Sequence, residues 1–346
     1  MSDASSGAPA VYVQTNDQTH NAVLAFARLA DGRLAAAGRF ETGGCGTGEP
    51  HLASQSSLVL SDDAAWLLVA NAGSDELSLF EVQDDGLRLA DCVGSGGGAP
   101  TNVTVHGTLV YVLNSATSSI AGFEIRDGRL VELGGSARLL SGADADPAQI
   151  AFSADGTTLV VTERATDSIS SYAVDEHGFA DGPTTIGSSG KTPYGFGFTA
   201  DGGLIVTEAF GGTPGAAAAS SYALTGPGRL SPVSGSVADT RSEVCWAVVT
   251  NDGRFAYVTN FGDGTISSYA IAADGSIELH NPVAAATRLG EKGVRDEAIT
   301  RDGRYLYAID TDAQRLFGWR LSDSGELESI GAFEGIPDTV AGLAAA

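Results

Sequence analysis

CWAVVTNDGRFAYVTNFGDGTISSYAI, residues 245–271, contains the three predicted strands that decide the fold of this chain. An opening strand runs into an Asp-Gly turn, and the apolar strand FAYVTN (255–260) then ends in a polar residue. TISSYAI (265–271) follows, with an aromatic residue at its fifth position. Strands in which apolar and polar residues alternate, separated by Asp-Gly, are typical of β-hairpins, because Gly readily takes the positive φ that such turns need. The stretch therefore predicts consecutive antiparallel strands.

The same pattern recurs along the whole chain. The aromatic residue at the fifth strand position appears seven times, at intervals of 43 to 54 residues: Phe26, Phe80, Phe123, Tyr172, Tyr222, Tyr269 and Trp319. A fixed period of about fifty residues indicates one supersecondary unit repeated many times. Four antiparallel strands per unit, arranged radially, form a β-propeller. We predict an all-β, seven-bladed β-propeller of four-stranded antiparallel blades.

The two ends of the chain predict how the ring closes. The first copy opens at VYVQTN (11–16), which matches the second strand of the other copies, so it lacks an innermost strand. The chain ends with the lone short strand 340–344. Pairing this tail with the first blade removes two unpaired sheet edges, and we therefore expect closure by the C-terminal strand. We predict one domain over residues 1–346, with residues 1–9 disordered.

Composition restricts the classes of partner. Asp and Glu number 43 against 19 Lys and Arg, which gives a formal net charge of −24. Such a surface repels polyanions, so nucleic acids and anionic membranes are poor partners. Three cysteines, an odd number at unrelated spacings, favour neither a disulfide framework nor a zinc site. We see no apolar run of about 20 residues and no secretory signal, and we expect a cytoplasmic protein without a cofactor.

The geometry of a propeller predicts which polar residues lie on the same face of the ring. Loops between the second and third strands share one face with the blade-to-blade crossings, around the mouth of the central channel. Seven polar residues end the second strands on this face: Asn16, Asn71, Asn114, Glu163, Glu208, Asn260 and Asp310. Two loops on this face are unusually long, 209–217 and 41–54. Insertions of this kind cluster where a repeat scaffold binds a ligand.

The mouth residues suggest acid–base chemistry. Glu163 and Glu208 replace the shorter Asn found at most equivalent positions, and carboxylates in a desolvated funnel can act as general acid or base. Arg295 can hold an anionic group, and His51 can assist. This set suits the opening or closing of a lactone. In the alternative interpretation, the strand-end ring ties loops together through side-chain to backbone hydrogen bonds.

Two further stretches carry a family resemblance. PAQIAFSADGTTLVVTERATDSISSYAV (147–174) and PYGFGFTADGGLIVTEAF (193–210) resemble the seven-bladed propeller lactonases, which include enzymes of the 6-phosphogluconolactonase type and carboxymuconate-lactonizing enzymes. The family's fourth blade has a Pro-Arg-His opening and a Val-Asn-Glu end. Here the opening is Pro147-Ala148-Gln149 and the end is Val161-Thr162-Glu163, so the Glu matches and the Arg and His are absent. The repeat also occurs in non-enzymatic propellers named for a Tyr-Val-Thr-Asn motif.

Two functional hypotheses follow. The first is a metal-independent lactone hydrolase or lactonizing enzyme acting on a small organic or sugar acid, with Glu163, Glu208, Arg295 and His51 as catalytic candidates. Its expected substrate-binding residues are Arg164, Gln149, Tyr194, Trp246, Asn260, Asn114, Glu297 and Asp310. The second is a non-catalytic propeller that binds a small ligand or a protein at the same mouth. A metal held by Glu163, Glu208 and Asn260 would indicate a different, metal-dependent lactonase.

Overall fold

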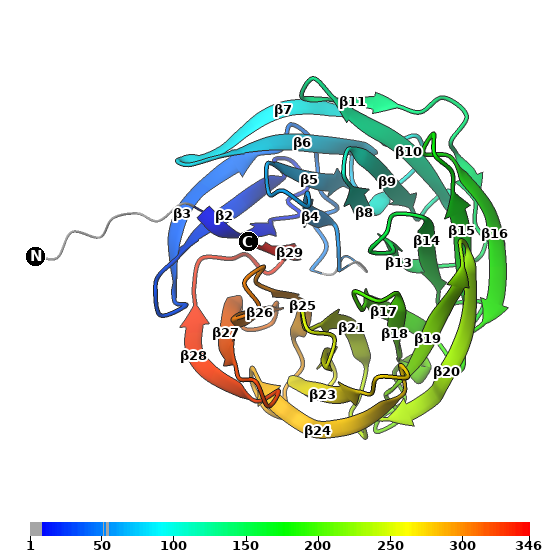
Figure 1. Cartoon of the computed structure of the whole chain (residues 1–346). Coiled ribbons are helices and arrows are strands. Elements are labelled where there is room, and N and C mark those ends of the chain that lie inside the picture. The colour runs from blue at the N-terminus through cyan, green and yellow to red at the C-terminus, as the bar shows by residue number, and fades with distance from the viewer. Residues whose placement is uncertain (1–8, 51, 53–54) are drawn as a thin grey trace, which may run out of the picture.

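The chain forms a closed ring of seven antiparallel sheets around a central axis. The computed structural model describes residues 9–50, 52 and 55–346. Over this part of the chain each sheet is a blade of four strands in sequential order, with two exceptions. The last strand of the chain is the innermost strand of the first blade, and in the third blade a fifth short strand shares the outer edge. Figure 1 shows the blades arranged radially around the axis. The predicted seven-bladed propeller is confirmed.

The two inner strands of each blade position the mouth residues. The innermost strands, from blade one to blade seven, are β29 (Ala341–Ala345), β4 (Leu58–Leu60), β8 (Pro100–His106), β13 (Pro147–Phe152), β17 (Pro193–Phe198), β21 (Val244–Val249) and β25 (Val294–Ile299). The second strands are β1 (Pro9–Gln14), β5 (Trp66–Asn71), β9 (Leu109–Asn114), β14 (Thr158–Glu163), β18 (Gly203–Glu208), β22 (Phe255–Asn260) and β26 (Tyr305–Asp310).

The two outer strands complete each blade. The third strands are β2 (Ala22–Arg28), β6 (Glu76–Gln83), β10 (Ser119–Arg126), β15 (Ser168–Val174), β19 (Ala218–Gly226), β23 (Thr265–Ile271) and β27 (Arg315–Leu321). The outermost are β3 (Leu34–Glu41), β7 (Gly86–Gly94), the pair β11 (Arg129–Glu132) and β12 (Arg138–Leu139), β16 (Ala180–Gly187), β20 (Arg229–Ala238), β24 (Ile277–Ala286) and β28 (Leu327–Phe333).

The repeated aromatic residue is the core residue of the third strand. All seven members occupy the fifth position of their strands and are at most 3% exposed. Apolar clusters lie between neighbouring blades; Phe26 of blade one, for example, shares a cluster with Tyr305 and Tyr307 of blade seven. Burial of these apolar side chains between sheets, at about 25 cal/mol per Å² of apolar surface, stabilises the ring.

The first blade differs by one residue from the sequence alignment. Val11 pairs with Phe26, whereas the residue that pairs with Phe80 in the second blade is Leu67. Four residues beyond Leu67 lies Asn71, so the first-blade equivalent of Asn71 is Thr15, and the assignment of Asn16 to this position was wrong. Asn16 lies beyond β1 with a left-handed φ of 53°, a conformation that Asn tolerates better than most residues.

The ring closes at the C-terminus, as predicted. β29 pairs antiparallel with β1, with Tyr12 opposite Ala344 and Val13 opposite Leu343. Figure 1 shows the red C-terminal strand beside the blue strands of the first blade. A second contact fixes the closure from the other side, because the backbone N–H of Gly342 donates to the Asp296 carboxylate on β25.

The two long segments predicted for the mouth face join the expected strands, and residues 51, 53 and 54 of the second lie outside the described part of the chain. The segment 209–217 joins β18 to β19 and contains the short 3₁₀ turn η1 (Phe210–Gly212). The first crossing runs from residue 42 to residue 57, between β3 and β4. Among the described residues, no helix has the length and apolar character needed to span a membrane.

Leu343→Ala tests the closure. Leu343 is 5% exposed and packs with Val11 and Val13. Loss of this buried side chain is expected to lower the free energy of unfolding by about 2–4 kcal/mol in denaturant titrations. Leu289→Ala, at a residue that is 69% exposed, is the matched control and should change stability by less than about 0.5 kcal/mol. Equal unfolding midpoints for the two variants would contradict the closure.

Candidate functional site

Glu163 fastens the incoming blade crossing to its own blade. It ends β14 and is fully buried. Its carboxylate accepts hydrogen bonds from the backbone N–H (3.2 Å) and hydroxyl of Ser141, in the crossing from the third blade. The hydroxyls of Ser170 (2.6 Å) and Thr166 (3.2 Å) also donate to it. Both oxygens are therefore directed into the crossing.

Glu208 occupies the same position in the fifth blade. Its Oε1 accepts the N–H of Gly190 at 2.7 Å and the hydroxyl of Ser220 at 2.5 Å. Gly190 is required by this close approach, since a Cβ there would lie 2.1 Å from Glu208 Oε2. The same arrangement holds for Asn114, which exchanges hydrogen bonds with Ser95, and for Asp310, which pairs with Arg288 at 3.3 Å.

The remaining strand-end positions follow this pattern or a close variant. Asn71 Oδ1 accepts from the hydroxyl of Thr42 at 2.8 Å, in the first crossing. The buried amide of Asn260 instead donates to Ser267 on its own blade at 2.8 Å. The alternative interpretation, that this ring ties loops together, thus describes the contacts of these side chains. A catalytic role for Glu163 and Glu208 stays a prediction.

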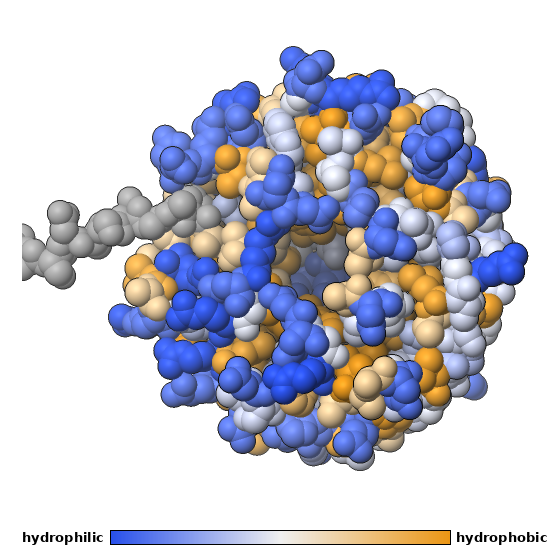
Figure 2. Space-filling model, in the orientation of Figure 1, coloured by the Kyte–Doolittle hydropathy of each residue, from blue (hydrophilic) through white to orange (hydrophobic). Residues whose placement is uncertain are grey.

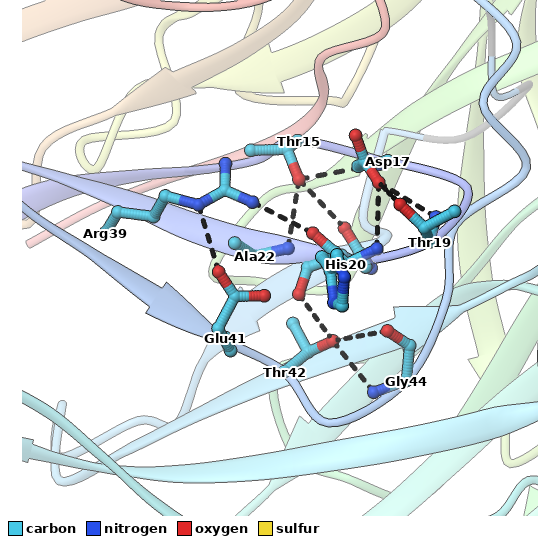
Figure 3. Close-up of polar contacts among 10 residues, drawn as sticks. Thr15, Asp17, Thr19, His20, Ala22, Arg39, Glu41, Thr42 and Gly44 are labelled. Carbon is cyan, nitrogen blue, oxygen red and sulfur yellow. Dashed lines mark hydrogen bonds and ion pairs between the residues drawn. The ribbon is translucent and has the colours of Figure 1, made fainter.

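The first blade closes its mouth loop through a carboxylate and a hydroxyl. Figure 3 shows Asp17 Oδ1 accepting the backbone N–H groups of Thr19 and His20, both at 2.8 Å. These hydrogen bonds lower the pKa of Asp17 to about 2. Thr15 accepts the N–H of Ala22 at 2.9 Å, and His20 accepts a hydrogen bond from Arg39 through its carbonyl. His51, the predicted assisting base, lies outside the described residues.

Two glutamines pair with the open edges of innermost strands. Gln149 donates to the carbonyl of Phe196 at 3.0 Å and accepts its N–H at 2.8 Å. In the next blade the position of Gln149 is taken by Gly195, where a Cβ would lie 2.6 Å from the Trp246 ring. Gln55, from the first crossing, reaches across the axis and makes the equivalent pair with Ala247, at 3.1 and 3.2 Å.

A pocket of about 490 Å³ opens on the mouth face between blades four and seven. Three equivalent positions supply most of its lining. The residue before the innermost strand gives Asp146, Thr192 and Glu243; the second residue of that strand gives Tyr194, Cys245 and Arg295; and the residue after the second strand gives Arg164, Ala209 and Phe261. Gly211 and Gly212 of the long loop complete one wall. Figure 2 shows that the ring is hollowed at its centre, with hydrophilic residues along one side of the opening and more apolar residues along the other.

Backbone strain marks the rim of this pocket. Asp146, Thr192 and Glu243 have left-handed φ values of 46°, 56° and 54°. This conformation is unfavourable for most residues and most unusual for the β-branched Thr192. Their carbonyls each accept a backbone N–H from the residue after the second strand, at 2.9 to 3.1 Å. These backbone hydrogen bonds hold the three rim residues in place beside the pocket that they line.

Two arginines are stacked on aromatic rings in the pocket wall. The Arg164 guanidinium lies 4.8 Å from the centre of the Tyr194 ring, donates to the Tyr194 hydroxyl at 2.9 Å and pairs with Asp146 at 2.6 Å. The Arg295 guanidinium lies 4.2 Å from the Phe261 ring and donates from Nε to Thr311 at 3.0 Å. Stacking and hydrogen bonds fix both planar cations at little entropic cost on binding.

The acidic side chains of the pocket differ in exposure. The Glu243 side chain is 29% exposed and pairs with Lys292 at 2.7 Å, whereas the Asp146 side chain is 58% exposed. Burial raises the pKa of Tyr194 above its usual range, so its hydroxyl stays protonated at neutral pH. Burial likewise raises the pKa of the Cys245 thiol to about 12. No group of three or more His, Cys, Asp or Glu suited to a metal occurs in the part of the chain described here.

The structure brings together three of the predicted site residues, namely Arg164, Tyr194 and Arg295. Trp246 is fully buried and packs against Tyr194, with ring centres 4.8 Å apart. Glu297 lines a separate cavity on the axis, where burial and the neighbouring Asp296 raise its pKa. The sequence reasoning placed Glu243 in a mouth-face crossing but not among the site residues, and it missed Cys245 and Phe261. Their signal is positional, because each is one residue away from a strand end that the repeat alignment had already located.

Comparison with known families decides the identity of the fold. The family described as "Lactonase, 7-bladed beta-propeller" matches residues 11–143, 106–209 and 208–339. The chain belongs to the seven-bladed β-propeller lactonase family. No curated protein matches the chain.

Solved structures show the same fold at low sequence identity. A protein from Lactobacillus plantarum has a TM-score of 0.76 and 17% identity, over 97% of this chain and 98% of its own. A putative 6-phosphogluconolactonase from Bacteroides fragilis has a TM-score of 0.73 and 16% identity, over 99% of both chains. The periplasmic gluconolactonase of Pseudomonas aeruginosa has a TM-score of 0.72 and 18% identity, over 97% of this chain and 98% of its own. Because one of these structurally similar proteins is periplasmic, the expected cytoplasmic location of this protein stays a prediction.

The pH dependence of Cys245 alkylation tests whether its thiol is a nucleophile. With a pKa of about 12, the thiolate fraction at pH 8 is about 10⁻⁴. Iodoacetamide should therefore modify Cys245 slowly at pH 8, and its rate should rise about tenfold per pH unit up to pH 10. Peptide mass mapping separates Cys245 from Cys45 and Cys92, and Cys245→Ser is the control. A rate that levels off below pH 8 would instead indicate an activated thiol.

Proposed function

We propose that this protein opens or closes the lactone ring of a small organic or sugar acid in the mouth pocket, by acid–base catalysis without a metal. The observation that carries the proposal is the pair of arginines, Arg164 and Arg295, in one concave pocket of a chain with 43 acidic and 19 basic residues. Against this overall charge, local guanidinium groups are what an anionic substrate needs for binding. Membership of the lactonase family supports a small-molecule substrate.

Arg295 is the proposed anchor for the substrate's anionic group. Its guanidinium is held against Phe261 and Thr311 at the seventh-blade side of the pocket. A carboxylate bound there leaves the lactone carbonyl directed toward the fourth and fifth blades. Arg164 and the Tyr194 hydroxyl then supply positive charge and a proton donor for the carbonyl oxygen, as an oxyanion site requires.

Glu243 is the proposed general base. Its partial burial and its position on the strained rim suit a group that takes a proton from water next to the substrate. In hydrolysis, water adds to the carbonyl carbon and its proton passes to Glu243. The tetrahedral oxyanion then collapses, the ring C–O bond breaks, and the leaving alkoxide takes the proton back. Lactonization is the same sequence in reverse.

Arg295→Gln and Glu243→Gln test these roles on a panel of lactones with a pH indicator. Loss of a charge-assisted hydrogen bond is expected to raise KM for anionic lactones about 10- to 100-fold in Arg295→Gln, with little change for neutral lactones. Glu243→Gln should lower kcat about 10²- to 10⁴-fold. Arg33→Gln, at an exposed arginine of an outer turn, is the control and should match the parent protein. Absence of turnover on every lactone, with a ligand still bound in the pocket, would favour the non-catalytic binding propeller.

Glu163→Gln tests whether Glu163, the carboxylate predicted from the sequence, or Glu243, on the rim, acts as the base. The amide keeps only one acceptor oxygen, so the hydrogen bonds that the hydroxyls of Ser141 and Thr166 donate to Oε2 are lost, and the free energy of unfolding should fall by about 1–3 kcal/mol. We expect the turnover rate, at a temperature where the variant is folded, to stay within about threefold of the parent value, well inside the loss expected for Glu243→Gln. A loss of turnover in folded Glu163→Gln as large as that expected for Glu243→Gln would return the catalytic role to this residue.

A further inference from the structure

A carboxyl side chain interrupts the apolar layer that surrounds the axis. In every blade one residue of the innermost strand pairs with the residue two before the second-strand end, taking Thr15 as that end in the first blade. In six blades this position is apolar: Leu343, Leu58, Val103, Ile150, Phe196 and Ala247. In the seventh blade it is Glu297. The repeat itself therefore has no structural need for a charge here.

Glu297 has no hydrogen-bond partner in the described part of the chain. It is 1% exposed, and both carboxyl oxygens are buried without a donor. A buried carboxylate in an apolar surrounding costs several kcal/mol unless it is paired. The neighbouring Asp296 cannot pair with it, because that carboxylate accepts the N–H of Gly342 and is itself an acceptor. The group is poised for a ligand that supplies positive charge.

Glu297 lines a cavity that can hold such a ligand. The cavity has a volume of about 330 Å³, and its lining residues include Gln55 and Ser56 from the first crossing and Ala247 from the sixth blade. The Gln55 bridge to Ala247 holds an amide oxygen and a backbone carbonyl in the lining. These are neutral oxygens of the kind that complete the shell of a hard cation, and Ser56 also lines the cavity.

We propose that Glu297 is the anionic ligand of a metal cation held in the axial cavity, with neutral oxygens of the lining and water as its other ligands. One carboxylate with neutral oxygens suits Ca²⁺ or another oxygen-preferring cation bound weakly, in the millimolar range. The net charge of −24 raises the local concentration of cations around the chain. The ion ties the sixth and seventh blades together next to the closure. This proposal is independent of the mouth pocket, whose lining does not include Glu297.

Thermal unfolding with single cations tests the site. The protein is dialysed against a chelator, and Tm is measured with Ca²⁺, Mg²⁺ or K⁺ against tetramethylammonium chloride of equal ionic strength. We expect at least one cation to raise Tm by about 2 °C or more at a concentration well above its Kd. Glu297→Gln should lose this rise. Glu278→Gln, which removes an exposed carboxylate of β24, should keep it and controls for cations bound to the acidic surface.

Two results would overturn the proposal. One is the absence of a rise with every cation, and the other is an equal rise in the parent protein, Glu297→Gln and Glu278→Gln. If Glu297→Gln fails to fold, crystals of the parent protein soaked in Mn²⁺ give a direct reading. An anomalous scattering peak beside the Glu297 carboxyl supports the site, and a map without one there contradicts it.

Discussion

The hydrogen bond between a buried strand-end side chain and the incoming blade crossing is the interaction on which the mouth of this propeller depends. A crossing must leave one sheet and enter the next, and its backbone groups are unpaired where it does so. Asn, Glu or Asp at the end of the second strand supplies acceptors inside the ring, at Asn71, Asn114, Glu163, Glu208 and Asp310. Hydrogen bonds to charged groups contribute about 1.5–3 kcal/mol each, so a change from Asn to Glu at this position is compatible with the same structural role.

Because of this constraint, the candidate catalytic groups do not lie at the strand ends themselves but next to them in the sequence. Because the strand-end side chains turn into the crossings, the groups left to face the mouth are the residue after the second strand and those at the start of the next innermost strand. Arg164 and Phe261 come from the first position, and Tyr194, Cys245 and Arg295 from the second. The rim residues with left-handed φ, Glu243 among them, are held by backbone hydrogen bonds from the residue after the second strand. Structural ties and candidate catalytic groups thus alternate along the chain.

The pocket gathers positively charged side chains, although the protein as a whole is acidic. The guanidinium groups of Arg164 and Arg295 are stacked on Tyr194 and Phe261, which fixes their planes before a substrate arrives. Lys292 adds a third cation at the rim, paired with Glu243. Cys245 lies among these cations, yet desolvation outweighs their effect and its thiol stays protonated. Carboxylate and phenol groups are therefore better suited than the thiol to the chemistry of the pocket.

The sequence by itself determined the blade count, the strand order and the closure by the C-terminus, because these follow from local patterns: an aromatic residue near every fiftieth position, Asp-Gly turns and a lone final strand. It also located the mouth face and three residues of its pocket. Only the tertiary structure decided that Glu163 and Glu208 turn into crossings, that Thr15 replaces Asn16 in register, and that Gln55 spans the axis to Ala247. Each of these depends on which segment a side chain or strand meets in the folded ring, and a repeat pattern carries no information on which neighbour a polar side chain will meet.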